Sequence, residues 1–168
     1  FKPTCARHFV AEHLSAFKNK IIDVADVFPR THLSALAAIG NTHNLRQQLA
    51  HIEQLLAQLY RKQSASPIDA GAHFIKQQQG QARIADAARQ AGLSMPQFRK
   101  RFQQEVGMSP KEYSKIVRVG AIIQQLEQRP NQKLVELAYA AGYFDQAHFT
   151  KDFQSVTGVT PSAHLKTA

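Results

Sequence analysis

The chain contains one sequence pattern twice, about fifty residues apart, and this repeat constrains its fold more than any other feature. Each copy has a small-residue stretch ending in glycine, then two phenylalanines four residues apart, then a glycine three residues before a proline. The matching pairs are Gly92 and Gly142, Phe98 and Phe149, Phe102 and Phe153, Gly107 and Gly158, and Pro110 and Pro161. Their separation is 50 residues at the first glycine and 51 afterwards, so the second copy has one extra residue in its turn.

The first copy predicts a helix, a short turn and a second helix. The apolar face of the first helix is formed by Ile84, Ala87, Ala88 and Ala91. Gly92 can adopt the positive φ of a tight turn, and the Ser94 side chain is expected to accept hydrogen bonds from the first turn of the next helix. Pro96 is tolerated there because it falls in that first turn, and we expect the helix to end near Val106.

A long helix is predicted from Pro110 to just before Pro130, and the second copy follows it. Gly120 in its interior costs about 1 kcal/mol relative to alanine, so we expect tight packing or a bend there. The first helix of the second copy is expected to use Leu134, Leu137, Ala138 and Ala141. Asp145 is expected to cap the next helix, from Gln146 to about Val156, and residues 161–168 to add one more helical turn.

Helical periodicity gives each second helix an inward and an outward face. In the first copy Phe98, Phe102 and Glu105 point inward, and in the second copy Phe149, Phe153 and Val156 do so. The outward residues are Pro96, Arg99, Lys100 and Gln103 in the first copy, and Ala147, Thr150, Lys151 and Gln154 in the second. Such polar faces suit hydrogen bonding to DNA base edges: Arg and Lys donate to guanine, Gln pairs with adenine, and Ala or Thr contacts the thymine methyl. A solvated surface charge is the alternative for any single cation, and two equivalent faces favour the DNA interpretation.

The pattern resembles the double helix-turn-helix DNA-binding domain of AraC/XylS-type transcription regulators over about residues 68–165. The residues that carry the resemblance are A-x-x-A-G, F-x-x-x-F and G-x-[ST]-P in both copies, with Tyr113, Arg118, Ala121 and Leu126 between them. The resemblance implies a seven-helix domain that places two recognition helices in adjacent major grooves. Pro96 departs from the family, because relatives can have a large or polar side chain at this position.

The expected site has base-contacting and phosphate-contacting residues, and no catalytic, metal or cofactor site. The resemblance implies base contacts from Pro96, Arg99, Lys100, Gln146, Ala147, Thr150 and Lys151, and the outward face of the first copy adds Gln103. The expected phosphate contacts are Ser94, Arg101, Lys111, Asp145 and His148.

The expected fold is all-α, with two helix-turn-helix subdomains joined by a long linking helix and preceded by a mainly helical N-terminal segment. The expected division is a remnant of an effector or dimerisation domain in 1–66 and a DNA-binding domain in 67–168. Within the latter we expect helix-turn-helix one at 84–107, the linking helix at 110–128 and helix-turn-helix two at 134–158. We also expect that the native protein extends upstream of Phe1.

The N-terminal third is less regular. We expect 1–3 to end an extended segment, 6–17 to form a short helix and 21–24 to have strand-like character. Residues 45–60 predict an amphipathic helix whose stripe comprises Leu45, Leu49, Ile52, Leu56 and Leu59. One interpretation is a homodimer seam through 45–60, but the stripe is shorter than the three or four heptads typical of a coiled coil. Packing within its own domain is the alternative, and a polar linker at 63–67 ends the segment.

Charge and composition exclude several classes of protein. The net charge is +9, which favours a polyanionic partner. The single cysteine, Cys5, excludes an internal disulfide framework and any multi-cysteine metal site. No H-E-x-x-H, G-x-S-x-G or P-loop pattern is present, so we expect no enzyme.

The expected function is a sequence-specific transcription regulator, activator or repressor, in the bacterial cytoplasm on the nucleoid. The expected partners are double-stranded DNA and RNA polymerase, with no membrane. A non-specific architectural DNA-binding protein is the main alternative, because phosphate contacts alone would satisfy the charge. A helical partner-binding module, which would bind no DNA, is a third.

Overall fold

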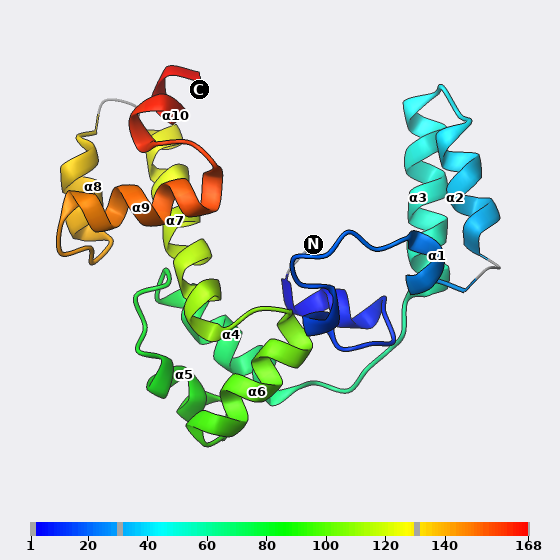
Figure 1. The fold of residues 1–168 in the computed structure, drawn as a ribbon, viewed down its shortest axis with the longest axis horizontal. Coiled ribbons are helices and arrows are strands. Elements are labelled where there is room, and N and C mark those ends of the chain that lie inside the picture. Colours follow the sequence, from blue (N-terminus) through cyan, green and yellow to red (C-terminus); the bar gives the residue numbers. More distant parts are fainter. Residues whose placement is uncertain (1–2, 30–31, 130–131, 168) are drawn as a thin grey trace. The chain divides into compact units, whose positions relative to one another are not determined.

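The computed structural model describes residues 3–29, 32–129 and 132–167, and all regular structure in these ranges is helical (Figure 1). The N-terminal elements are the 3₁₀-helices η1 (Pro3–His8) and η2 (Leu14–Phe17) and the α-helices α1 (Val24–Val27), α2 (Leu33–Gly40) and α3 (Leu45–Leu59). The later helices are α4 (Pro67–Gln77), α5 (Ile84–Gln90), α6 (Met95–Val106), α7 (Pro110–Gln128), α8 (Leu134–Ala140), α9 (Gln146–Thr157) and α10 (Pro161–Thr167). The prediction of an all-α fold with a long linking helix is confirmed.

The chain forms two compact units. One comprises the residues up to Ser66 together with Lys100–Met108, and the other comprises Pro67–Arg99 and the residues from Ser109 onward. The last turns of α6 therefore group with the N-terminal residues. The assignment of 1–66 and 67–168 as separate domains stays a prediction.

The turn between α5 and α6 is made by a left-handed glycine and by alanines that allow close helix approach. Gly92 has φ of +64°, and the Leu93 N–H donates to the Ala88 carbonyl oxygen at 3.0 Å. On α4, Gly71 lies so close to the Phe98 ring that a Cβ there would come within 2.5 Å of it. The first turns of α6 are thereby fixed against α4 through Phe98, which is fully buried.

The second copy repeats this construction. Gly142 has φ of +78°, and the Tyr143 N–H donates to the Ala138 carbonyl oxygen at 3.0 Å. The extra residue of this copy is Phe144, whose side chain is 89% exposed, so the insertion is accommodated by projecting one residue into solvent. A buried cluster joins α7, α8 and α9 through Val119, Ile122, Leu126, Leu137, Ala138, Ala141, Tyr143, Phe149 and Phe153.

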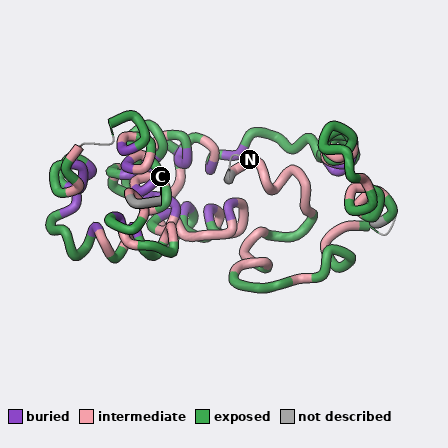
Figure 2. The backbone as a smooth tube through the Cα atoms, turned by 90° about the horizontal axis from the view of Figure 1, so that it is seen from above, coloured by how far each residue is buried: buried purple, intermediate pink, exposed green. Residues whose placement is uncertain are grey.

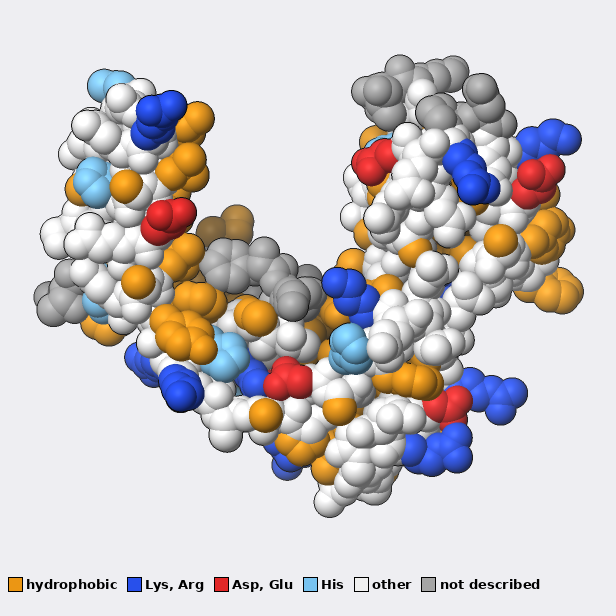
Figure 3. Space-filling view, turned by 180° about the vertical axis from the view of Figure 1, so that it is seen from behind, with side chains coloured by type: hydrophobic (Ala, Val, Ile, Leu, Met, Phe, Trp, Pro, Cys, Tyr) orange, Lys and Arg blue, Asp and Glu red, His pale blue; other side chains and the backbone are white. Residues whose placement is uncertain are grey.

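The burial pattern distinguishes helices α4–α9 from α2 and α3. Figure 2 shows that most buried positions belong to α4–α9, while α2 and α3 are largely exposed. Helix α3 forms as predicted and packs on α2. Only its C-terminal apolar residues, Leu55 and Leu59, are buried, while Leu45, Leu49 and Ile52 are 68%, 51% and 37% exposed. Hydrophobic side chains are accordingly visible on the surface of the α2–α3 pair (Figure 3).

The expected strand-like segment at 21–24 is wrong, because a local cap starts a helix there. The Asp23 carboxylate accepts from the Ala25 N–H at 2.8 Å and begins α1, and Ile21 is completely exposed with no sheet to join. The single helix expected at 6–17 is also wrong. The His8 carbonyl oxygen, which a continuing helix would need, accepts instead from the Arg61 N–H at 2.7 Å. The extended end expected at 1–3 is wrong at Pro3, which begins η1, and its other two residues, Phe1 and Lys2, lie outside the described residues.

Gly120 lies in the interior of α7, where tight packing or a bend was expected, and the first of these, tight packing, is wrong. The residue is exposed, and a Cβ added to it would meet no atom within 4 Å. The helix begins with a capping box, in which Ser109 and Glu112 each bond the other's backbone N–H. Sequence reasoning did not identify this capping box.

We predict that Gly120→Ala stabilises the protein by about 1 kcal/mol, because alanine loses less backbone entropy in a helix and the space is open. Urea unfolding followed by circular dichroism would measure it. Gln124→Ala, at an exposed position on the same helix, should change stability by only a few tenths of a kcal/mol. A destabilising Gly120→Ala would show that the position needs glycine.

Candidate nucleic-acid interface

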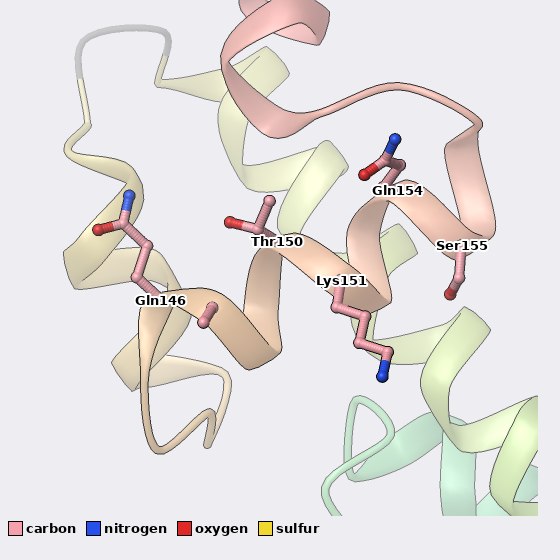
Figure 4. Close-up of a pocket in the computed structure, with 6 residues that line it drawn as sticks. Gln146, Thr150, Lys151, Gln154 and Ser155 are labelled. Atoms are coloured by element: carbon pink, nitrogen blue, oxygen red, sulfur yellow. The ribbon is translucent and has the colours of Figure 1, made fainter.

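Helix α9 presents the polar surface predicted for it. The residues Gln146, Ala147, Thr150, Lys151, Gln154 and Ser155 line a shallow, open hollow of about 860 Å³ (Figure 4). Phe149 and Phe153 lie on the opposite face and are 1% and 0% exposed. The predicted inward and outward faces of α9 are therefore confirmed, and the structure brings all four of its predicted base-contacting residues to one surface.

Sequence reasoning missed part of this hollow. Helical periodicity puts Gln154 on the outward face, although the expected base contacts do not include it, and the sequence predicts no role for Ser155. Gln154 follows Ala147 by seven residues, or about two helical turns, so the two side chains lie on the same face. This spacing is a signal from which Gln154 could have been predicted as a base contact. Ser155 is also bound to the linking helix, since the Lys115 ammonium donates to its hydroxyl oxygen at 3.0 Å.

Helix α6 has the same division of faces. Phe98 and Phe102 are both 0% exposed, which confirms their inward placement. The predicted outward residues Pro96, Arg99, Lys100 and Gln103 are all exposed. Within the part of the chain that the structure describes, the Arg99 and Lys100 side chains make no hydrogen bond or ion pair, and nor does Lys151 on α9. Helix α6 thus presents two cations, and α9 one, that have no partner among the described residues.

Arg101, a predicted phosphate contact, differs because its charge is compensated within the protein. Its guanidinium nitrogens Nη2 and Nε lie 3.0 and 3.2 Å from Glu105 Oε1, and Nη2 lies 3.4 Å from Ser66 Oγ. Glu105 also accepts from Arg7 Nη1 at 2.9 Å, so one carboxylate holds two guanidinium groups. The Arg101 side chain is still 41% exposed.

Three other predicted phosphate contacts lie near helix ends. Lys111 is exposed in the first turn of α7. Asp145 caps α9, since its carboxylate accepts from the His148 N–H at 2.7 Å, so a phosphate contact at Asp145 would have to come from its backbone. The half-exposed His148 ring packs edge-on against Tyr143 at 5.1 Å, and its Nε2 lies 3.5 Å from the Asp152 carboxylate.

The cap expected from Ser94 is formed differently. Its hydroxyl donates to Gln97 Oε1 at 2.9 Å instead of accepting from the helix, and its backbone N–H donates to the same oxygen at 3.2 Å. Gln97, three residues on, therefore fixes the start of α6. The Ser94 side chain remains exposed, and its predicted contact with phosphate stays a prediction.

The described residues give no sign of two other kinds of site. No group of three or more His, Cys, Asp and Glu side chains in the described ranges is arranged to hold a metal ion. None of the helices in those ranges is both long and apolar enough to span a bilayer.

Residues 87–167 match the sequence family described as "Helix-turn-helix domain". Two relatives carry similar names. An "Uncharacterized HTH-type transcriptional regulator" of Haemophilus influenzae is 32% identical over 93 residues, covering 55% of this chain and 31% of the relative. The "Uncharacterized HTH-type transcriptional regulator YidL" of Escherichia coli is 35% identical over 83 residues, covering 49% and 28%. The aligned part of the chain thus spans less than a third of the length of either relative, and both names are those of regulators and not of enzymes.

Two solved structures share the fold. The C-terminal domain of AraT, a response regulator from Geobacillus stearothermophilus, has a TM-score of 0.57 at 19% identity, covering 64% of this chain and 89% of that one. ToxT from Vibrio cholerae has a TM-score of 0.55 at 15% identity, covering 83% of this chain and 56% of that one. At these identities the likeness shows the fold alone.

We predict that Asp145→Ala destabilises the protein by about 1 kcal/mol, because it removes the acceptor for the His148 N–H. Ser94→Ala should cost less, since Gln97 still accepts from the backbone N–H at the start of α6. Urea unfolding of both variants would measure the difference. Asp145→Asn keeps a capping oxygen and should stay within a few tenths of a kcal/mol of the parent chain. Equal losses for Asp145→Ala and Ser94→Ala would contradict the assignment.

Proposed function

We propose that the chain is a transcription regulator of the AraC type that binds double-stranded DNA sequence-specifically. The proposal is supported by the match of residues 87–167 to a helix-turn-helix family and by the fold shared with the C-terminal domain of AraT. Helices α6 and α9 would enter adjacent segments of the major groove as two recognition helices. The observation that carries the proposal is that α6 and α9 both bury two phenylalanines on one face and expose a polar surface at equivalent positions on the other.

The exposed residues divide into groups with different roles in base recognition. On α6, Arg99 and Lys100 would donate to guanine O6 and N7, and Gln103 would pair with adenine. Pro96 has no donor and would offer only an apolar contact. On α9, Gln146 and Lys151 would hydrogen-bond base edges, while Ala147 and the Thr150 methyl group would contact thymine methyl groups.

Phosphate contacts would set the register of the protein on the duplex. We propose that Lys111, His148, Ser94 and the partly exposed Arg101 guanidinium contribute such contacts, with backbone N–H groups near Asp145 acting at the start of α9. Since Glu105 already neutralises part of the Arg101 charge, the free cations of α6 are Arg99 and Lys100. We expect α6 still to supply more electrostatic affinity than α9.

The composition of α9 favours this function over a purely architectural one. Of the six residues that line its hollow, only Lys151 is charged, and the others are Gln146, Ala147, Thr150, Gln154 and Ser155. Amides, hydroxyls and methyl groups discriminate between base edges but attract phosphates weakly. A protein that bound only the DNA backbone would need more cations on this surface.

Selection of sites from random DNA with the full chain, followed by competition binding at about 0.15 M salt, tests the proposal. We expect the selected site to be preferred over scrambled DNA by roughly 10³-fold or more. Arg99→Ala should cost about 1–3 kcal/mol at that site and relax its sequence preference more than Lys151→Ala does. Arg46→Ala on α3, which removes the same charge outside residues 67–168, is the matched control. Equal affinity for scrambled DNA would leave only the architectural function.

Partners other than DNA follow from this function. A regulator of this kind would act at promoters, so we propose RNA polymerase as a partner, and DNA binding would place the protein on the nucleoid.

We further propose that a second copy of the chain covers the exposed part of the α3 stripe. Leu45, Leu49 and Ile52 recur every three or four residues, and an identical stripe on a second copy offers the same apolar chemistry.

Sedimentation velocity of the full chain tests the dimer. We expect the mass of the sedimenting species to be that of two chains. Leu49→Glu should reduce it to the mass of one chain, because the substitution puts a charge into the apolar seam. Gln54→Glu adds the same charge at an exposed position of α3 outside the stripe and should leave the dimer intact. A monomeric parent chain would contradict this proposal without bearing on DNA recognition.

A further inference from the structure

One side chain of the linking helix α7 contacts both the loop between α4 and α5 and the second helix-turn-helix subdomain. The Arg118 guanidinium donates to the carbonyl oxygen of Gly80, just after α4, from Nη2 at 2.7 Å and from Nε at 3.3 Å. Its Cζ atom also lies 5.2 Å from the ring centroid of Tyr143, in the turn between α8 and α9. Arg118 therefore makes charge-assisted hydrogen bonds to Gly80 on one side and a cation–π contact with Tyr143 on the other.

A second contact joins the same two regions without α7. The Gln81 side-chain amide donates to the Ala140 carbonyl oxygen, at the end of α8, at 3.2 Å. The turn glycine of the second copy lies beside the same side chain, because a Cβ on Gly142 would come within 3.1 Å of Gln81 Oε1. The loop after α4 thus touches the second subdomain directly.

Gly80 allows this loop to lie on α7. Its φ is +76°, and a Cβ there would stand 2.2 Å from the Ser114 carbonyl oxygen and 2.7 Å from the Arg118 nitrogen. No other residue permits so close an approach of two backbones. The approach places the Gly80 carbonyl within reach of Arg118.

Tyr143 connects these contacts to the recognition helix α9. Its ring is 2% exposed and packs edge-on against His148 at 5.1 Å and Phe149 at 5.5 Å. Burial, reinforced by the nearby Asp152 carboxylate, raises the pKa of Tyr143 to about 12, although Arg118 opposes the shift. The phenol is therefore neutral at physiological pH, and its ring can accept the Arg118 cation.

We propose that Gly80, Gln81, Arg118 and Tyr143 form a brace that fixes how α9 is held relative to α4 and α7, and that this brace sets the DNA half-site spacing the protein accepts. Arg118 and Gln81 are positioning residues and touch no base. Without the brace, the second subdomain would be held to the rest of the unit by the buried cluster that joins α7, α8 and α9, by the Lys115–Ser155 hydrogen bond and by the α7–α8 connection. One base pair added between the half-sites turns one relative to the other by about 34–36° and moves it by about 3.4 Å. A protein whose recognition helices are held rigidly therefore binds the altered site poorly, whereas a more flexible protein still binds it. The spacing role rests on the proposed DNA recognition.

A measurement without DNA tests the brace itself. Spin labels at Ala85→Cys on α5 and Gln154→Cys on α9, in a Cys5→Ala background of the full chain, report the distance between the subdomains by pulsed electron resonance. We expect one narrow distribution, which Gln81→Ala combined with Arg118→Ala broadens about two-fold or more. Gln81 is exposed, so Gln81→Ala alone keeps the test valid if the double variant fails to fold. An unchanged width in both variants overturns the brace.

The spacing role is tested on the selected site and on versions with one base pair added or removed between its halves. The parent chain should lose about 10-fold or more in affinity on the altered sites, whereas Arg118→Ala and Gln81→Ala should lose less than about 3-fold. Lys133→Ala is the control, because it removes an exposed cation next to the second subdomain. It should lower the affinity for DNA equally at all spacings. Unchanged spacing penalties in both brace variants overturn the spacing role. A parent chain without any preferred site overturns the proposed function, while the spin-label result still decides the brace.

Discussion

The burial of two phenylalanines one helical turn apart determines the orientation of both candidate recognition helices. Phe98 and Phe102 on α6, like Phe149 and Phe153 on α9, are essentially inaccessible to solvent. Because a helix is rigid about its axis, burying these rings fixes which residues face outward. The bases that the protein would recognise therefore depend on side chains that DNA itself would never contact.

The repeat was sufficient to predict most of the second unit, because its signals are local. A left-handed glycine, a cap and two phenylalanines act within a few residues, so the positions of α5 to α9 and the polarity of their faces follow from periodicity. Capping was less predictable: the Ser94 hydroxyl has an alternative acceptor in Gln97, whereas the Asp145 carboxylate can only accept. Near the N-terminus, the Asp23 cap overrode the strand-like composition of the residues around it.

Contacts between distant parts of the sequence could not be predicted. Arg118 and Gly80 are 38 residues apart, and Gln81 and Ala140 are 59 apart, with no motif to pair them. The pairing of Arg7 and Arg101 with one carboxylate, Glu105, was equally hidden, and it changes the electrostatics of α6. Of the three consecutive cations Arg99, Lys100 and Arg101, only the first two have no ion-pair partner among the described residues. In the proposed function, the specificity of α6 would then depend on Arg99 and Lys100, and that of α9 on a mainly uncharged surface.

We propose that two helices of one chain read two adjacent major-groove segments on the same side of the duplex. Methylation interference with the full chain on its selected site tests this most directly, because guanine N7 lies in the major groove. We expect two clusters of interfering guanines about 10 base pairs apart, one for each recognition helix. A single cluster, or interference spread evenly along the site, would contradict it.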